Sequence, residues 1–493
     1  LVRSRGLGDV YKRQGLNYTH EENAYVDFDR DRLTYYMFST EGPAFAKADV
    51  NGDGTEDVYF GGAKTFSGKL WLGERSGTYR ESTQEAFATD ALSEDTDAVF
   101  FDADGDSDQD LFVTSGGNES GFASLELADR LYLNDGKGNF SKSDQAFLAV
   151  VTGSSSVVRV LDINSDGAPD LFVGGRLVPF TYGVPASSQL WINDGNGNFT
   201  EQSAALAPEL KDFGMVTDAQ VLDYDGDGKL DLVAVGDWMA PTFFKNQDNK
   251  LVKVELPELS SLKGWYRVVE VGDFDGNGLP DLALGNHGLN TRFKANTEHP
   301  VSLFLNDFDQ NGSIDHVFTR KEGNVQIPYT LKHELERQIP SVKKKYIKNA
   351  DYNNQSLSDI FPAEVISRSI VQELNHLESG ILLNLGKGKF EWKSFPKMAQ
   401  RSWTFAIQVI DINGDGKQDL LLGGNLTQVK PEAGKYDASY GEVLIGNGDG
   451  TFTFSPNREN GLKLEGDIRA FSLLENRRIL VVKNSAAAEI WTY

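Results

Sequence analysis

Short apolar runs alternate with polar turns rich in Asp, Asn and Gly along nearly the whole chain. The clearest example is the nine-residue stretch D-Y-D-G-D-G-K-L-D from Asp223 to Asp231, which is followed by the apolar run L-V-A-V-G. Glycines at positions four and six of this stretch allow the positive φ angles that fold a loop around a point. The short apolar run is typical of a buried strand. The pattern therefore predicts a tight loop that leads directly into a strand.

The loop recurs, and a second pattern lies between its copies. The first five loops begin 50 to 61 residues apart, and such fixed spacing indicates a propeller or solenoid. The second pattern is L-Y-L-N-D-G-K-G-N-F at Leu131–Phe140 and L-W-I-N-D-G-N-G-N-F at Leu190–Phe199, each of which predicts a hairpin. Each period thus supplies four antiparallel strands. We therefore predict an all-β fold, a β-propeller of four-stranded antiparallel blades.

The hairpin count favours eight blades and leaves seven open. The C-terminal tail supplies three strands without a loop, and we expect the strand near Leu33–Ser39 to complete that blade. The loop that begins at Asp307 follows L-F-L-N-D, which matches the hairpin pattern, so it is assigned to the second hairpin of the fifth blade. A partly helical insertion at about 321–378 then interrupts the repeat. The alternative is that this insertion replaces most of a sixth blade.

The domain organisation predicted is one propeller domain over 15–493. The first fourteen residues, L-V-R-S-R-G-L-G-D-V-Y-K-R-Q, are basic and unlike the rest of the chain, so we interpret 1–14 as a foreign leader. The native start and any export signal are then expected to be missing from the sequence.

The loops carry oxygen-bearing side chains at positions one, three, five and nine. Converging carboxylates repel one another, and a hard cation that takes six to eight oxygen ligands relieves this repulsion, which points to about seven structural Ca²⁺ sites. An EF-hand is excluded because position twelve of every loop is apolar. Metal-free turns are the alternative, although plain turns do not need a carboxylate at position nine. The predicted ligands are Asp49, Asn51, Asp53 and Asp57; Asp102, Asp104, Asp106 and Asp110; Asp162, Asn164, Asp166 and Asp170; Asp223, Asp225, Asp227 and Asp231; Asp273, Asp275, Asn277 and Asp281; Asp307, Asp309, Asn311 and Asp315; and Asp411, Asn413, Asp415 and Asp419.

The charge and composition narrow the classes of partner. A formal charge of −25 and a pI near 4.7 argue against nucleic acid or an anionic membrane as partner. The predicted ligands include 23 Asp residues, so seven bound Ca²⁺ would bring the charge to −11. The absence of cysteine excludes disulfides and thiolate catalysis. No apolar run reaches the length of a transmembrane helix.

The repeat D-x-[DN]-x-[DN]-G-x-x-D-L, with L-Y-L-N-D-G-x-G-x-F between copies, resembles the FG-GAP/VCBS repeat family of calcium-binding propellers. The resemblance extends over nearly all of 15–493. Three shorter stretches, G-N-H-G-L-N at Gly285–Asn290, K-K-K-Y at Lys343–Tyr346 and G-K-Y-D-A-S-Y-G at Gly434–Gly441, resemble the bacterial cartilage-acidic-protein-like (ASPIC/UnbV-associated) group. The resemblance implies structural calcium and an exported binding or adhesion module for a protein or glycan, located outside the cell, on its surface or in the periplasm. It brings no catalytic residues.

Six residues are candidates for a ligand surface because they lie outside the repeat pattern: Trp238, Trp265, His287, Lys343, Lys344 and Lys345. Each has a plainer interpretation as a packed indole, a turn-stabilising histidine or a solvated helix face. The alternative function is a calcium-dependent polysaccharide lyase or hydrolase. Such an enzyme needs a base and a charge-neutralising group that converge. Whether these six residues meet in one cleft distinguishes the two functions.

Overall fold

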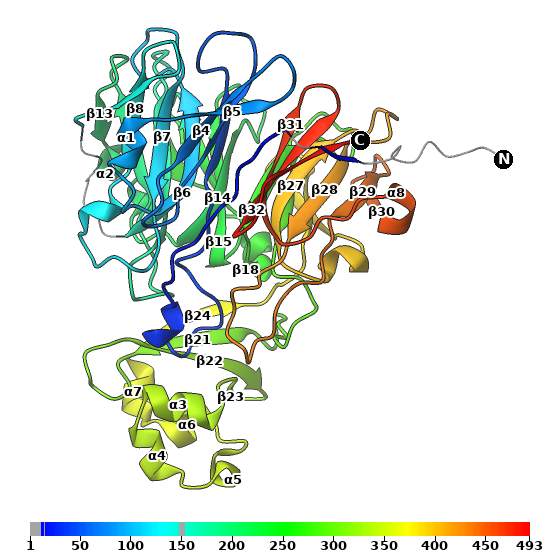
Figure 1. Ribbon diagram of the computed structural model, residues 1–493. Helices are drawn as coiled ribbons and strands as arrows, with labels where there is room; N and C mark the ends of the chain where they lie inside the picture. The colour runs from blue at the N-terminus through cyan, green and yellow to red at the C-terminus, as the bar shows by residue number, and fades with distance from the viewer. Residues whose placement is uncertain (1–10, 14, 146, 148–152) are drawn as a thin grey trace, which may run out of the picture.

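Seven four-stranded antiparallel sheets form the blades of a β-propeller, here called the ring (Figure 1). The structure is a computed structural model that describes residues 11–13, 15–145, 147 and 153–493. Blade one consists of β2 (Phe45–Ala48), β3 (Asp57–Phe60), β4 (Lys69–Gly73) and β5 (Tyr79–Ser82). Blade two consists of β6 (Asp95–Phe101), β7 (Asp110–Ser115), β8 (Arg130–Asn134) and β9 (Phe140–Lys142). Blade three consists of β10 (Ser154–Leu161), β11 (Asp170–Leu177), β12 (Gln189–Asn193) and β13 (Phe199–Glu201).

The remaining four blades follow in chain order, and one of them is interrupted. They are β14 (Met215–Leu222), β15 (Asp231–Met239), β16 (Thr242–Gln247) and β17 (Lys250–Lys253), with the short β18 (Gly264–Trp265) beside β15; β19 (Val268–Gly272), β20 (Asp281–Gly285), β25 (Gly380–Asn384) and β26 (Phe390–Ser394); β27 (Thr404–Ile410), β28 (Asp419–Gly424), β29 (Glu442–Gly446) and β30 (Phe452–Ser455); and β31 (Asp467–Leu474), β32 (Arg478–Asn484), β33 (Glu489–Thr492) and β1 (Tyr11–Arg13).

The first strands of the seven blades surround a central channel. A cavity of about 330 Å³ is lined by residues of β2, β6, β10, β14, β19, β27 and β31. Each of these strands packs beside the first strand of the next blade, from β2 to β31. Blades seven and one pack through a cluster that contains Leu480 and Val482 of β32 and Val58 and Phe60 of β3. Side-chain packing therefore continues around the whole ring.

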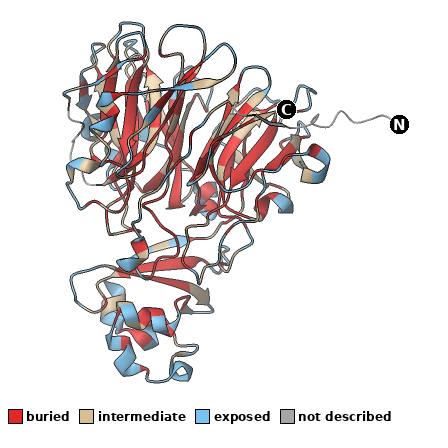
Figure 2. Ribbon diagram, viewed as in Figure 1, coloured by how far each residue is buried: buried red, intermediate tan, exposed pale blue. Residues whose placement is uncertain are grey.

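The apolar run after each loop forms the second strand of a blade, which is covered on both faces by neighbouring blades (Figure 2). In β15, Leu232 packs with blade three, whereas the next residue, Val233, packs with blade five. Since both faces are buried, both alternating positions must be apolar, and the run is continuous rather than alternating. Burying each such side chain contributes about 1.5–3 kcal/mol.

The residues from 286 to 379, here called the insert, lie between β20 and β25 of the fifth blade. They form an eighth four-stranded sheet from β21 (Val301–Asn306), β22 (Asp315–Glu322), β23 (Val325–Pro328) and β24 (Ile370–Leu374). Between β23 and β24 the chain forms five short helices: α3 (Lys332–Gln338), α4 (Ser341–Lys345), α5 (Asn349–Tyr352), α6 (Leu357–Ile360) and α7 (Ala363–Ser367). This unit stands at the lower end of the ring (Figure 1). It has a core of its own around Leu335, Ile339 and Phe361. The ring thus has seven blades, the smaller of the two numbers left open.

The loop at Asp307 joins β21 to β22 and so belongs to the inserted sheet. The second hairpin of the fifth blade is β25–β26, where Leu284 of β20 pairs with Gly380. The assignment of L-F-L-N-D to that hairpin was wrong. In the ring the matching letters lie on the third strand of a blade, whereas in the insert they lie on the strand that precedes a loop.

The terminal strands meet in the last blade, as predicted, but through a different N-terminal segment. β1 pairs antiparallel with β33, and it lies inside the first fourteen residues. The Leu33–Ser39 segment is not a strand of that blade. It runs along the base of the ring, where Tyr35, Tyr36 and Phe38 are buried, because three aromatic side chains gain more from burial there than at an exposed sheet edge. No helix in the described part of the chain is long and apolar enough to cross a bilayer.

Candidate functional site

The aspartate at position nine fastens each loop to its surroundings. One of its carboxylate oxygens accepts the backbone N–H of position two, at 2.9–3.4 Å in all seven loops. In the six ring loops the other oxygen accepts a backbone N–H from the third strand of the same blade, at 2.7–2.9 Å. Position nine therefore holds the loop closed and ties it to its blade.

The position-nine side chains are buried carboxylates with altered acidity. Burial raises the pKa of Asp57, Asp110, Asp170, Asp231, Asp281 and Asp315 to about 6, and the two backbone N–H donors oppose this rise in the ring loops. Burial also raises the pKa of Asp419. A charge at these positions is thus costly unless donors or a cation compensate for it.

Positions one, three and five are held by the loop backbone. In the loop of blade four, Asp223 accepts N–H groups from Gly226 and Gly228, each at 2.8 Å. Positions four and six have φ between 58° and 90° in every loop. This holds where the residue is not glycine, as at Ser107 with φ 74° and Gln310 with φ 59°. The predicted loop conformation is therefore present in all seven copies.

Carboxylates converge in four loops, those with Asp at positions one, three and nine. Oxygens of these three residues lie within 4.8 Å of one another in the loops that begin at Asp102, Asp223, Asp273 and Asp307. The other three loops have Asn at position three. Burial, and then the neighbouring charges of Asp106, raise the pKa of Asp104. An all-oxygen donor set of this kind suits a hard cation such as Ca²⁺.

Two further observations test whether a cation fits. Asp309 Oδ1, at position three of the insert loop, is buried and has no hydrogen-bond partner among the residues that the structure describes. Asp108 Oδ1, at position seven of the second loop, is in the same state, and burial followed by the repulsion of Asp106 raises the pKa of Asp108 to about 6. An unpartnered buried carboxylate oxygen beside other carboxylates is costly. The carboxylate oxygens of these two loops therefore fit the ligand set of a divalent cation.

The loop of blade four differs because an ammonium group stands beside it. Lys245 Nζ contacts Asp227 at 2.9 Å and also contacts Asp225. The two carboxylates raise the pKa of Lys245, and Lys245 lowers the pKa of Asp227. Lys245 therefore supplies part of the positive charge at this loop. The blade-four loop thus has a built-in cation, even though its sequence matches the repeat pattern most clearly of the seven loops.

Each ring loop is also bonded to the next blade through the carbonyl of position two. Asn134 Nδ2 on blade two donates to the Val50 carbonyl of the first loop at 2.8 Å, and Asn193 Nδ2 donates to the Ala103 carbonyl at 2.9 Å. In the other four ring loops the position-two carbonyl also accepts a hydrogen bond from the next blade, but the kind of donor varies. Asn246 Nδ2 donates to Ile163, Asn384 Nδ2 to Tyr224, the backbone N–H of Gly450 to Phe274 and Arg477 Nη2 to Ile412. This bond between blades was not predicted from the sequence, although the asparagine that donates it recurs in L-Y-L-N and L-W-I-N.

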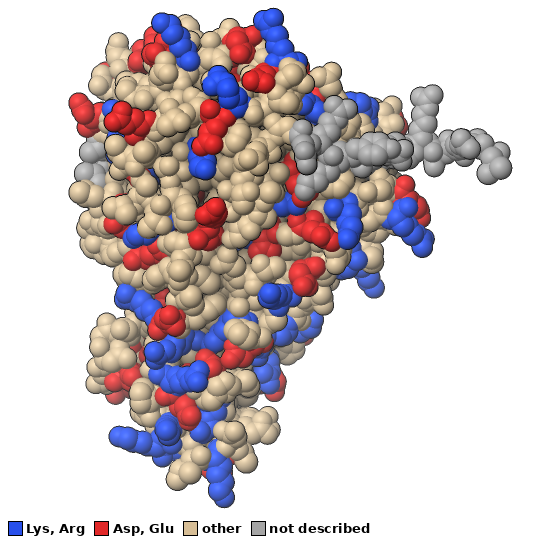
Figure 3. Space-filling model, viewed as in Figure 1, with Lys and Arg blue, Asp and Glu red and all other residues tan. Residues whose placement is uncertain are grey.

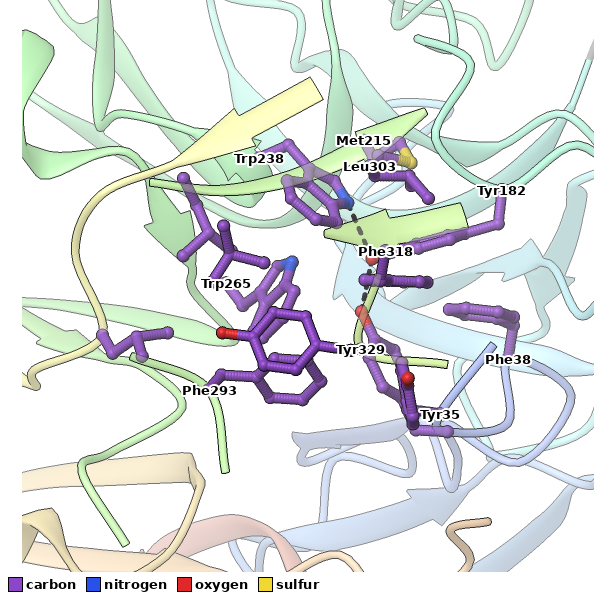
Figure 4. Close-up of a cluster of buried hydrophobic side chains, with 14 of the residues drawn as sticks. Tyr35, Phe38, Tyr182, Met215, Trp238, Trp265, Phe293, Leu303, Phe318 and Tyr329 are labelled. Carbon is purple, nitrogen blue, oxygen red and sulfur yellow. Dashed lines mark hydrogen bonds between the residues drawn. The ribbon is translucent and has the colours of Figure 1, made fainter. Parts of the chain in front are cut away.

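Trp238 and Trp265 lie in one buried cluster at the base of the ring (Figure 4), and the ring of His287, also buried, packs against Trp265. The exposed fractions are 4%, 0% and 2%. The two indoles make an edge contact with centroids 5.1 Å apart, and Trp238 Nε1 donates to Tyr182 Oη at 2.9 Å. Burial lowers the pKa of His287 to about 3. Since neither indole has an exposed face, this cluster packs the base of the ring and forms no open cleft.

A group of buried charges lies beside this cluster. Asp237 contacts Arg176 at 3.0 Å and Arg267 at 3.1 Å, and Arg176 also contacts Glu41 at 2.7 Å. The Tyr36 and Tyr182 hydroxyls hydrogen-bond to each other and to Asp237. Paired in this way, two arginines offset two carboxylates. The group fastens the N-terminal segment to the ring.

The three lysines do not join that cluster. They lie on α4, with exposed side chains, and the described contacts of the aromatic cluster do not include them. Lys345 Nζ donates to the carbonyls of Asp359 and Ile360 at the end of α6, so it also has a structural role. Lys343 and Lys344 have no such bonds among the described residues.

Comparison with protein-family models supports the repeat that the sequence predicts. A family model described as an FG-GAP-like repeat matches residues 49–113, 102–173, 180–234 and 223–284, and three of these four matches begin at the first residue of a loop. No curated protein matches the chain.

The chain is also similar to solved structures, at low identity. The crystal structure of Saccharomyces cerevisiae Sqt1 shares 10% identity at a TM-score of 0.42, covering 96% of this chain and 99% of that chain. The crystal structure of BBS1N in complex with ARL6DN, soaked with mercury, shares 11% at 0.42, covering 93% and 94%. The structure of the Dos1 propeller shares 9% at 0.40, covering 94% and 97%.

Proposed function

We propose that this FG-GAP-repeat propeller is an exported binding module in which Ca²⁺ stabilises the ring and the insert contacts an anionic partner. The family model for an FG-GAP-like repeat matches residues 49–173 and 180–284 in four overlapping or adjacent copies, and the all-β propeller supports a general binding module. Export would place the protein where calcium is about millimolar, outside the cell, on its surface or in the periplasm.

One observation carries this proposal. The same hydrogen-bonded frame occurs in seven loops, and in four of them three carboxylates converge within 4.8 Å. A bound Ca²⁺ would supply charge neutralisation there, held by the carboxylates at positions one, three and nine. Because position two of each ring loop bonds to the next blade, a cation in the loop would also stiffen contacts between blades.

Specificity is expected in the part that does not repeat. Positions shared by all blades serve the scaffold, and loops on a rigid scaffold are where binding residues concentrate. Between 286 and 379 the chain has 11 Lys and Arg against 12 Asp and Glu, which leaves a net charge of −24 for the rest. The insert is thus the part of the chain that repels an anion least.

The alternative, a polysaccharide lyase or hydrolase, has less support. Its candidate residues Trp238, Trp265 and His287 are buried at the base of the ring, and burial disfavours the protonated form of His287. A general base must reach its substrate within hydrogen-bond distance. The binding module therefore accounts better for where these side chains lie.

Calorimetric titration of calcium-depleted protein with Ca²⁺ tests the metal part of the proposal. We expect saturable binding at several sites, and Asp102→Asn combined with Asp104→Asn should remove one of them. Asp135→Asn combined with Asp194→Asn is the matched control, because these aspartates lie in hairpin turns outside the loops. Binding that the loop variant leaves unchanged, or no binding by the wild type, would contradict the proposal.

A further inference from the structure

A basic hollow lies on the insert at residues that the repeat pattern does not mark. It has a volume of about 410 Å³ and is lined by six residues, none of them acidic: Arg292, Lys294, His299, Arg320, Lys321 and Tyr329. In a chain of net charge −25, four Lys and Arg side chains around one hollow are a strong local reversal of charge. Figure 3 shows Lys and Arg side chains spread over the lower part of the molecule, where the insert lies.

Three of these cations lack a carboxylate partner among the described residues. Arg292 donates to the main-chain carbonyls of Glu432 at 3.2 Å and Tyr329 at 3.0 Å, and Lys294 donates to that of Leu289 at 3.3 Å. Lys321 has no ion pair in the described part of the chain. Main-chain carbonyls fix the positions of Arg292 and Lys294 without neutralising their charge, so the hollow keeps a positive potential.

Tyr329 holds the two arginines in place. The guanidinium carbons of Arg292 and Arg320 each lie 5.7 Å from the centre of its ring, and the ring of Phe293 packs against it at 5.0 Å. Tyr329 is 7% exposed, so its ring is a support and offers no open face. Arg320 Nε also pairs with Glu322 at 2.7 Å, so its charge is partly compensated. The charge left to attract a carboxylate or sulfate group comes from Arg292, held in place on this ring, and from Lys294 and Lys321.

A second hollow shares three of these lining residues. Arg292, Arg320 and Tyr329 also line a cavity of about 630 Å³ between the end of β23 and α5. The amides of Asn349, Asn353, Asn354 and Gln355 line it as well. Amides donate to and accept from hydroxyl groups. The two hollows together thus offer cations and hydroxyl-binding amides around the same pair of arginines.

Building on the proposed function, we infer that this basic hollow is the binding site and that its ligand is an acidic polysaccharide, with carboxylate or sulfate groups at the cationic end and hydroxyl groups along the amide wall. A peptide strand is disfavoured because the edge strand β23 is four residues long, ends in Pro328 and packs against α6. Nucleic acid is disfavoured because the rest of the chain carries −24.

The test is calorimetric titration with short oligogalacturonates in excess calcium, with neutral oligogalactans as the ligand control. The wild type should bind the acidic saccharide and ignore the neutral one. Lys294→Ser combined with Lys321→Ser should weaken binding at least tenfold, and added salt should weaken wild-type binding, because the attraction is electrostatic. Lys343→Ser combined with Lys344→Ser is the matched control, since these exposed lysines do not line either hollow.

Other outcomes separate this inference from the proposed function. If the Lys343 and Lys344 variant loses binding while the Lys294 and Lys321 variant retains it, the hollow is not the site, although the insert still binds an anion. If the wild type binds polyglutamate and no acidic saccharide, the ligand class is wrong. If neither polyanion binds, both the inference and the anionic partner of the proposed function fall.

Discussion

The same nine-residue loop occurs in two settings, in six blades of the ring and once in the insert. In a ring blade such as the fourth, Asp231 accepts one backbone N–H from its own loop and another from the third strand, at Asn246. In the insert, Asp315 accepts the loop N–H in the same way, but its second donor is the side chain of Gln338 on α3. The nine residues thus determine the loop, and the surroundings determine what the loop holds together.

The neighbouring asparagine shows the same difference. In the ring, Asn193 bonds to the preceding blade at Ala103, which joins two repeats. In the insert, Asn306 donates to the Val365 carbonyl on α7 at 2.7 Å. The ring therefore uses the pattern to fasten blade to blade, whereas the insert uses it to fasten a sheet to its helices. Calcium removal should then loosen contacts between blades more than it disturbs the binding surface.

The largest expected effect is that of Asp231→Ala in the ring. The substitution leaves two buried backbone N–H groups without an acceptor, at about 1–3 kcal/mol each, so the free energy of unfolding should fall by about 2–6 kcal/mol. Denaturant unfolding in excess calcium measures this change. Asp223→Ala is no substitute, because its donors are exposed. A loss below 1 kcal/mol would show that the loop does not depend on position nine.

A smaller effect is expected for Asp315→Ala in the insert. Only one main-chain donor loses its acceptor, since the Gln338 side chain can turn to water, so the loss should be about 1–3 kcal/mol. Hydrogen exchange should locate the loosening in the insert and leave the ring protected. If exchange rises equally in the ring blades, the two settings of the loop are not independent.

The ring should also respond to pH through Glu270, which lines the channel. Burial, and then the charge of Asp218, raise its pKa from 4.5 to about 7, so the folded state binds the proton more tightly than the unfolded state. This stabilisation is complete below pH 4.5 and is lost as the pH rises through 7. After allowance for solvent screening, we expect about 1–2 kcal/mol.

Glu270→Gln should flatten that part of the dependence of melting temperature on pH, measured in excess calcium between pH 5 and 8. The exposed Glu258→Gln serves as control. An unchanged pH profile in the Glu270 variant would mean that the channel carboxyl titrates normally.

The smallest effect is expected for Lys343→Ser combined with Lys344→Ser. Both lysines are exposed on α4, so the free energy of unfolding should change by less than about 0.5 kcal/mol. Adding Lys345→Ser should cost more, because Lys345 bonds to two carbonyls at the end of α6. Equal melting of the double and triple variants would show that those bonds do not stabilise the insert.

Much of the ring could be predicted from the sequence, because a loop fixed by its own backbone recurs at regular spacing. The strand directly after the loop and the positive φ at Gly226 and Gly228 follow from the loop pattern, although β15 extends to Met239, beyond the predicted run L-V-A-V-G. The blade count could not be fixed, since the inserted sheet has the same letters at Leu303–Asp307. Local patterns repeat in both settings, and pairing between distant strands decides which setting applies.

The candidate site was harder to predict because burial and convergence are tertiary properties. Trp238 and Trp265 lie outside the hairpin pattern, and nothing local shows that the Leu33–Ser39 segment covers them. Arg292 and Arg320 come together only through the ring of Tyr329. The Lys343 to Lys345 run was conspicuous in sequence, yet the basic hollow is lined by other residues.

The central claim, that calcium bound in the loops holds the blades together, is tested most directly by thermal unfolding with and without a chelator. The melting temperature in millimolar Ca²⁺ should fall by a wide margin when EGTA removes the metal, because a ligand that binds only the folded state stabilises it by mass action. Restoring Ca²⁺, but not Mg²⁺, should restore the transition. If EGTA leaves the melting curve unchanged, the loops are plain turns and the claim is contradicted.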